Sequence, residues 1–288
     1  MAQSLAPVEE WQGDDTTVAE IERALAELRE ASDLRTSVMT HTAWVPVEWL
    51  DAARETLAGL AERHPSRTII LVPRPEADDA LDAHVSLESF PLLGEQRRMC
   101  SEVIELHLKG RRAEAAASIV LPLLLPDLPV FIRWRGRPPF GSDVLDDLVG
   151  VVDRLVVESR EWDDVGEALR SLAELFEWTA VSDIAWSRTL PWRVEIARLW
   201  PDVADASELR VAGPESEALL LVGWLRSRLG RDVDLVREAA DRVEAVAVDG
   251  QDVPTPKEPP RSASELLSEE LDRFSRDHVY EAAVKGAD

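Results

Sequence analysis

The stretch from Ile119 to Gly136, IVLPLLLPDLPVFIRWRG, constrains the fold of this chain more than any other. Pro122, Pro126 and Pro129 exclude one long helix through it, because each proline lacks a backbone N–H and its ring clashes with the preceding turn. The stretch must therefore contain a helix end, a tight crossover and a strand. We expect the helix at 113–125 and the strand at 130–134.

The rest of the first two thirds of the chain alternates between apolar, β-rich runs and helical stretches. Such alternation is typical of a parallel sheet with right-handed crossovers and helices on both faces. The predicted fold class is α/β, with a largely parallel, doubly wound sheet and a smaller C-terminal α+β domain. Besides 130–134, the expected strands are 37–45, 68–72, 101–108 and 154–158, and besides 113–125 the expected helices are 47–63, 144–149 and 165–176. Segment 84–90 is either an additional strand or an irregular insertion.

The ends of the chain follow other patterns. Thr17 and Glu20 are spaced as a capping box for an amphipathic helix over 17–31, which follows a loose tail. Beyond Trp178, Pro191 and Pro214 suit the first turns of helices that run to residues 200 and 229. Short strands are expected at 209–211, 233–236 and 242–248.

A Pro-rich connector, 248–260, precedes a last helix that Ser262 and Glu265 open, with Leu267, Leu271 and Phe274 on one face. We therefore expect three parts. Residues 1–34 form a tail and helix, 35–178 the α/β domain, and 179–288 the α+β domain that ends in the linker and helix.

The charge of the chain excludes several partners. Its 56 acidic residues against 32 basic ones give a formal net charge of −24, which repels nucleic acid and anionic membranes. The apolar runs are too short to span a bilayer, and residues 1–20 lack the basic start and apolar core of a signal peptide. We expect a cytoplasmic protein that binds neither nucleic acid nor membrane.

Catalytic and cofactor signatures are absent from the sequence. There is no GxGxxG, and the loop at 136–143, GRPPFGSD, has Ser142 where a phosphate-binding loop needs Lys. Cys100 is the single cysteine, which excludes an internal disulfide and favours a buried thiol over a nucleophile. The five histidines have no metal-binding spacing. Glu105 and His107 could form an acid and base pair, although a partly exposed polar strand face explains them better.

Two aromatic and arginine clusters are the candidate binding residues. The first cluster, at the carboxyl end of a predicted central strand, consists of Arg133, Trp134, Arg135 and Arg137. The second cluster consists of Trp186, Arg188, Trp192 and Arg193. Open α/β sheets bind ligands at such strand ends, and guanidinium groups hold phosphates or carboxylates bidentately. The alternative is that these arginines only pair with surface acids, which contributes little.

Several segments together resemble the OpcA family of glucose-6-phosphate dehydrogenase assembly or activator subunits. They are CSEVIELHLKG from Cys100, LPLLLPDLPVF from Leu121, HPSRTIILVP from His64, SDIAWSRTLPW from Ser182, ALLLVGWLRSRLG from Ala218 and the terminal ELLSEELDRFSRDHVYEAA. LPLLLPDLPVF is the most specific of them.

The resemblance implies a non-catalytic subunit that assembles or activates glucose-6-phosphate dehydrogenase, which supplies NADPH in the oxidative pentose phosphate pathway. The resemblance thus implies that glucose-6-phosphate dehydrogenase is the partner. It implies that the chain itself binds no cofactor. With Cys100 alone, the redox control of photosynthetic members cannot carry over as an internal dithiol switch. The sequence also departs from the family motif at Arg133, because members of the family usually have an aromatic residue at this position. The alternative function is an enzyme or sensor that binds a sugar phosphate or nucleotide at Arg133 to Arg137.

Overall fold

The computed structural model describes residues 9–30, 37–60, 63–91, 98–257, 259 and 261–287. Residue 9 and residues 88–91 and 98–100 are described by their backbone alone, so the environment expected for the Cys100 thiol lies outside the described side chains. The chain divides into two compact units, residues 1–155 and 156–288. Each unit is described by itself.

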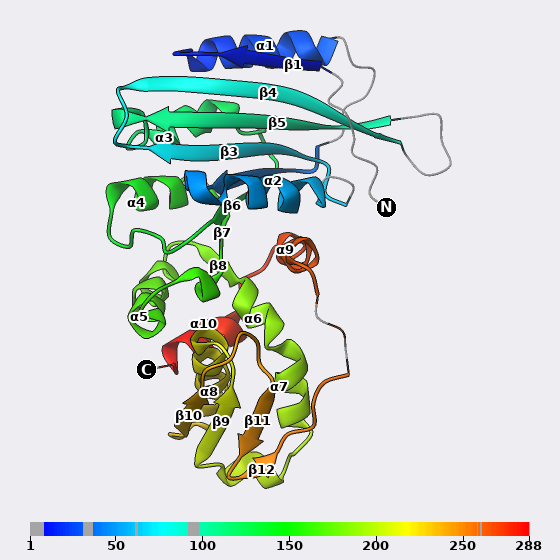
Figure 1. Ribbon diagram of the computed structural model, residues 1–288, viewed down its shortest axis with the longest axis vertical. Coiled ribbons are helices and arrows are strands. Elements are labelled where there is room, and N and C mark those ends of the chain that lie inside the picture. Colours follow the sequence, from blue (N-terminus) through cyan, green and yellow to red (C-terminus); the bar gives the residue numbers. More distant parts are fainter. Residues whose placement is uncertain are drawn as a thin grey trace. The chain divides into compact units, whose positions relative to one another are not determined.

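The first unit is built on long strands with short helices between them (Figure 1). Its strands are β1 (Glu9–Gly13), β2 (Met39–Trp44), β3 (Ser66–Arg74), β4 (Ala80–Pro91), β5 (Arg98–Lys109), β6 (Val130–Trp134) and β7 (Arg154–Val157), where the units divide. Its α-helices are α1 (Val18–Glu30), α2 (Leu50–Ala58), α3 (Ala116–Val120) and α4 (Asp143–Val149). Turns of 3-10 helix, η1 (Val47–Trp49), η2 (Gly110–Arg112) and η3 (Leu121–Leu123), join them.

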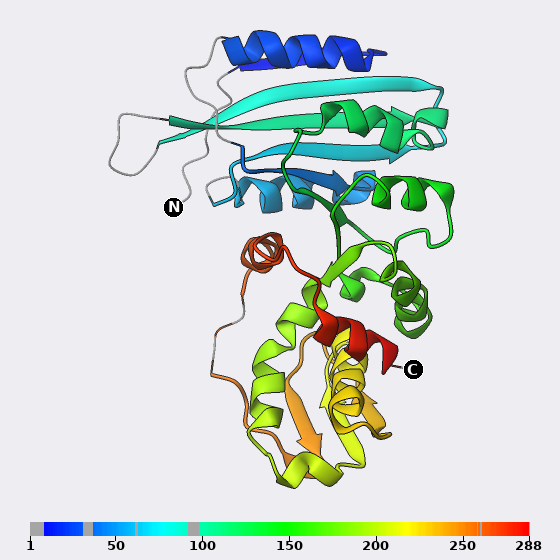
Figure 2. The same cartoon turned by 180° about the vertical axis from the view of Figure 1, so that it is seen from behind.

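The strand order is β1-β4-β5-β3-β2-β6-β7-β8, where β8 is Ala180–Asp183. The central pairs β5·β3, β3·β2 and β2·β6 are parallel, whereas β1·β4 and β4·β5 are antiparallel. Helix α2 lies in front of the sheet in Figure 1, and α3 lies in front when the molecule is seen from behind in Figure 2. The predicted α/β class, with a largely parallel sheet and helices on both faces, is therefore confirmed.

Buried apolar side chains hold α2 on its face of the sheet. Leu50 and Ala53 of α2 pack with Ile70 and Val72 of β3. Along β3 the burial is continuous from residue 66 to residue 72, as expected of a strand covered on both faces. The same packed cluster includes Ala43 and Val45 at the end of β2. This strand pairs with β6, where the first arginine cluster begins.

Three expectations for this unit need correction. The tail contains a strand, because residues 9–13 pair with β4, in the register Trp11 to Val85. The helix expected at 113–125 is the short α3 followed by η3, since Pro122 starts a tighter turn. The helix expected at 47–63 begins as η1 and ends at residue 58, where Gly59 is the cap. Of the two alternatives at 84–90, the strand is confirmed as part of β4.

The second unit carries a small sheet and most of the longer helices. Its further strands are β9 (Glu208–Ala212), β10 (Asp234–Glu238), β11 (Ala245–Val248) and β12 (Gln251–Asp252), in the order β10-β9-β11-β12. Its α-helices are α5 (Val165–Leu175), α6 (Ile184–Arg188), α7 (Leu190–Ala197), α8 (Glu215–Leu229), α9 (Ala263–Leu271) and α10 (His278–Lys285), with 3-10 turns η4 (Ser159–Glu161) and η5 (Asp202–Asp205).

The core of this unit forms between the small sheet and helices α7 and α8. Leu221 and Leu225 of α8 share one buried cluster with Leu209 and Val211 of β9 and with Ile196 of α7. β9 pairs in parallel with β10 and antiparallel with β11, which confirms the predicted mixed α+β character.

Two features of this unit differ from expectation. The last helix ends at Leu271, and Phe274, expected on its apolar face, is 67% exposed in the following loop. A new helix begins beyond it because the Asp277 side chain accepts hydrogen bonds from the N–H groups of Val279 and Tyr280. The expected connector at 248–260 opens with a hairpin, since Asp249 and Gly250 take the positive φ of a two-residue turn between β11 and β12. In the described part of the chain, no helix is both long and apolar enough to cross a bilayer.

Candidate functional site

The first arginine cluster begins inside the sheet. In the register of β2 and β6, Trp134 lies opposite Trp44, and their buried rings stack at 4.7 Å with 15° between their planes. Arg133 is also buried, and its guanidinium donates to the carbonyl oxygen of Trp134. Both residues therefore stabilise the end of β6 from within.

The second half of this cluster lies where the chain leaves the strand. Arg135 donates its backbone N–H to the carbonyl of Trp44 at 2.9 Å, and its guanidinium lies 4.5 Å from the centre of the Trp49 ring. Arg137 is exposed. Among the residues that the structure describes, neither arginine lines any of the three cavities described below. This cluster can contact a partner mainly through Arg137.

The second cluster is held by α6 and α7. The Arg193 guanidinium lies 3.4 Å from the centre of the Trp186 ring, whose indole N–H donates to Asp277 at 2.9 Å. Burial lowers the pKa of Arg193 to about 10, against the opposing effect of Asp277. Arg193 stays charged at neutral pH, so the contact is a partly buried cation–π interaction.

The other two members of the second cluster line a cavity. Arg188 contacts both carboxylate oxygens of the buried Glu158 at 2.6 Å, and Trp192 packs into the core of the unit. Arg160, Arg242 and Arg261 line the same cavity. The sequence did not single out these three arginines, because they are far apart along the chain and only the fold brings them to Arg188.

The side chain of Asp183, at the start of α6, is a buried carboxyl group. Asp183 caps this helix and accepts hydrogen bonds from the N–H groups of Ser159 at 3.1 Å and Ala185 at 2.9 Å. The Tyr280 hydroxyl donates to its second oxygen at 3.4 Å. Burial, followed by the nearby charge of Glu158, raises the pKa of Asp183 to about 7. This group therefore titrates near neutral pH.

The Glu105 and His107 pair makes contact, with 2.8 Å between Nε2 and the carboxylate. Arg54 also donates to Glu105, at 2.7 and 2.8 Å. Burial alone would raise the pKa of Glu105, but the hydrogen bonds from His107 and Arg54 outweigh it and hold the pKa below its usual value. Both residues line a cavity of about 360 Å³. The arrangement is an ion-paired strand face, and Glu105 is a weak base there.

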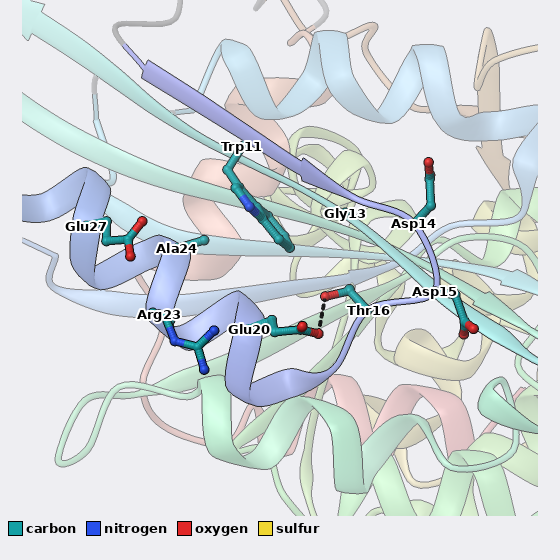
Figure 3. A pocket seen from close by; sticks show the side chains of 9 residues that line it. All are labelled: Trp11, Gly13, Asp14, Asp15, Thr16, Glu20, Arg23, Ala24 and Glu27. Carbon is teal, nitrogen blue, oxygen red and sulfur yellow. Dashed lines mark hydrogen bonds between the residues drawn. The ribbon is translucent and has the colours of Figure 1, made fainter.

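A third cavity, of about 330 Å³, lies between β1 and α1 (Figure 3). Trp11 and Glu20 point toward it from the two elements, and the Thr16 hydroxyl donates to Glu20 at 3.0 Å. Its charged lining is mostly acidic, with Arg23 as the one basic side chain among the described lining residues. In the described part of the chain, no group of three or more His, Cys, Asp or Glu side chains is placed to hold a metal ion.

The geometry defines a two-unit α/β protein with one cluster of arginine and tryptophan side chains in each unit. Residues 58–174 match the family described as glucose-6-phosphate dehydrogenase subunit N-terminal domain, and residues 179–284 match the corresponding C-terminal domain. The chain belongs to this OpcA family, as its sequence motifs indicated. The domain boundary expected at residue 178 stays a prediction. The structure divides into its two compact units at residue 155.

Three proteins whose names describe them as OxPP cycle protein OpcA are similar to the chain. The protein of Synechocystis sp. is 27% identical over 185 residues, which are 59% of this chain and 38% of that protein. The protein of Nostoc punctiforme is 26% identical over 194 residues, 63% of this chain and 42% of that protein. The protein of Synechococcus elongatus is 27% identical over 182 residues, 59% and 41% of the two chains. The chain thus spans about two fifths of the length of these relatives.

Proposed function

We propose that this protein is a non-catalytic subunit of glucose-6-phosphate dehydrogenase, which it assembles or activates in the cytoplasm as part of the oxidative pentose phosphate pathway. The observation that carries the proposal is the consecutive match of residues 58–174 and 179–284 to the two domains of the OpcA family. One match would identify a shared domain, whereas two in order identify a shared architecture.

The mechanism that fits such a subunit is differential binding. A protein activates an enzyme only if it binds the active conformation or assembly more tightly than the others. Arg and Trp side chains dominate the energy of many protein interfaces, so Arg137 and the exposed Trp178 and Trp200 are candidate contact residues. Arg133 and Trp134 would support such a contact only from beneath, because both are buried.

The direct test is complex formation with the dehydrogenase of the same organism. The two purified proteins are mixed, and the mass of the product is measured by size-exclusion chromatography with light scattering. We expect a species heavier than either protein alone. Arg137→Glu should weaken the complex by about 1 to 3 kcal/mol if Arg137 makes a charge-assisted contact. Arg198→Glu, an exposed change just beyond the end of α7, is the matched control.

A further inference from the structure

A cavity of about 560 Å³ lies entirely within the second unit. Its walls come from η4, α6, α7, α8, the segment before β11, the segment before α9 and α9 itself. Its volume lies in the range of roughly 300 to 1,000 Å³ that is usual for small-molecule sites. The cavity therefore has room for a metabolite.

The lining is basic in a strongly acidic protein. Arg160, Arg188, Arg242 and Arg261 line the cavity from four separate segments, against the two carboxylates of Glu217 and Glu244. The chain as a whole carries −24. Each of these guanidinium groups also faces a carboxylate, Glu217 for Arg160, Glu158 for Arg188, Glu244 for Arg242 and Glu269 for Arg261. The cavity therefore offers an anion several fixed N–H donors rather than a large net positive charge.

The cavity arginines have N–H groups beyond those used in their ion pairs. A guanidinium has five N–H donors. Within the described part of the chain, Arg188 contacts Glu158 through Nη1 alone, and Arg160 contacts the fully buried Glu217 through Nη2 alone. Arg242 lies 3.7 Å from Glu244, a long contact, and its side chain is 72% exposed. The existing ion pairs hold Arg160 and Arg188 in place and leave further N–H groups for a bound anion.

The remaining lining suits a hydroxylated carbon skeleton. The half-exposed carboxylate of Glu244 and the hydroxyl of Thr255 can accept hydrogen bonds from sugar hydroxyl groups. Trp192 and Pro256 supply apolar surface beside them. A phosphate group would occupy the arginines, since planar guanidinium groups bind phosphate oxygens in pairs.

We propose that this cavity binds a phosphorylated sugar, with Arg160, Arg188, Arg242 and Arg261 around the phosphate. Such a site would allow the subunit to respond to a metabolite. The inference is independent of the proposed function, because it concerns binding to the isolated chain.

Isothermal titration calorimetry of the purified full chain tests it with three probes: glucose 6-phosphate, inorganic phosphate and glucose. We expect glucose 6-phosphate to bind one molecule per chain, inorganic phosphate to bind about tenfold more weakly, and glucose to give no binding heat. Arg242→Gln and Arg188→Lys should each weaken the binding of glucose 6-phosphate about tenfold or more, as expected for a lost charge-assisted hydrogen bond. Arg188→Lys keeps a cation beside the buried Glu158, which protects folding.

The matched control is Arg231→Gln. Arg231 pairs with Asp205 at 3.3 Å on the surface of the same unit and does not line the cavity, so its loss should leave binding unchanged. The proposal is overturned if wild-type protein gives no binding at millimolar glucose 6-phosphate, if inorganic phosphate binds equally well, or if the control weakens binding as much as the cavity variants. None of these outcomes depends on the dehydrogenase.

Discussion

Gly223 of α8 and Gly286 at the end of α10 bring their two helices into backbone contact. A Cβ atom on Gly223 would lie 2.0 Å from the carbonyl oxygen of Ala283, and one on Gly286 would lie 2.6 Å from the carbonyl oxygen of Gly223. Contacts this short exclude any side chain at either position. Because α8 also supplies Leu221 and Leu225 to the core, this contact ties the end of the chain to the centre of the second unit.

Replacing Gly223 with alanine should destabilise the protein by about 1 to 3 kcal/mol or more, since the added methyl group meets backbone that cannot rotate away. Gly166→Ala in α5 is the control. The nearest atom to its Cβ is 3.9 Å away, and alanine favours a helix over glycine by about 1 kcal/mol. Urea unfolding of both variants measures the difference. Equal stabilities would contradict the close packing of α8 on α10.

Asp183 should make stability depend on pH. Its pKa is raised from 3.8 to about 7, so between these pH values the folded state holds a proton that the unfolded state has released. The stability that this group contributes is complete below pH 3.8 and is lost as the pH rises to about 7. Asp183→Asn keeps a neutral side chain and an acceptor for the two backbone N–H groups.

The measurement is urea unfolding at a series of pH values. We expect the free energy of unfolding of Asp183→Asn minus that of the wild type to increase steadily as the pH rises from 3.8 to about 7. Above about pH 7 this difference should stay constant. Asp205→Asn, whose carboxylate is fully exposed, should follow the wild type. Parallel curves for Asp183→Asn and the wild type would show that Asp183 is ionised throughout.

Replacing Trp134 and Trp178 with alanine should change the stability of the protein by different amounts. Trp134 is 2% exposed and stacks on Trp44, so Trp134→Ala should cost about 3 to 5 kcal/mol of stability. Trp178 is 81% exposed, and Trp178→Ala should change stability by less than about 0.5 kcal/mol. Urea unfolding followed by circular dichroism measures both. Similar losses in the two variants would contradict this placement of the rings.

Local signals in the sequence predicted much of the fold. The strand at 130–134 follows from the proline spacing and agrees with β6, and Thr17 with Glu20 correctly marked the start of α1. Pro214 marked the start of α8. In each case the signal is set by neighbouring residues, which is why it can be read without the tertiary structure.

Other elements depend on distant contacts. EEWQG at 9–13 has no strand pattern of its own. It forms β1 only because its backbone pairs with the edge of β4. β8, at 180–183, is one residue shorter than β1 and was not predicted either. The cavity arginines were missed for the same reason, apart from Arg188, since no spacing rule joins Arg160 to Arg242 or Arg261. The order of Arg and Trp along the chain also could not distinguish the buried Trp134 from the exposed Arg137.

The central claim is tested most directly by titrating the glucose-6-phosphate dehydrogenase of the same organism with this chain while activity and complex mass are followed together. The account predicts that both rise and reach a plateau at the same fixed ratio of the two proteins, because only preferential binding to the active assembly can activate the enzyme. If neither the activity nor the mass changes at micromolar concentrations of both proteins, the proposed function is wrong.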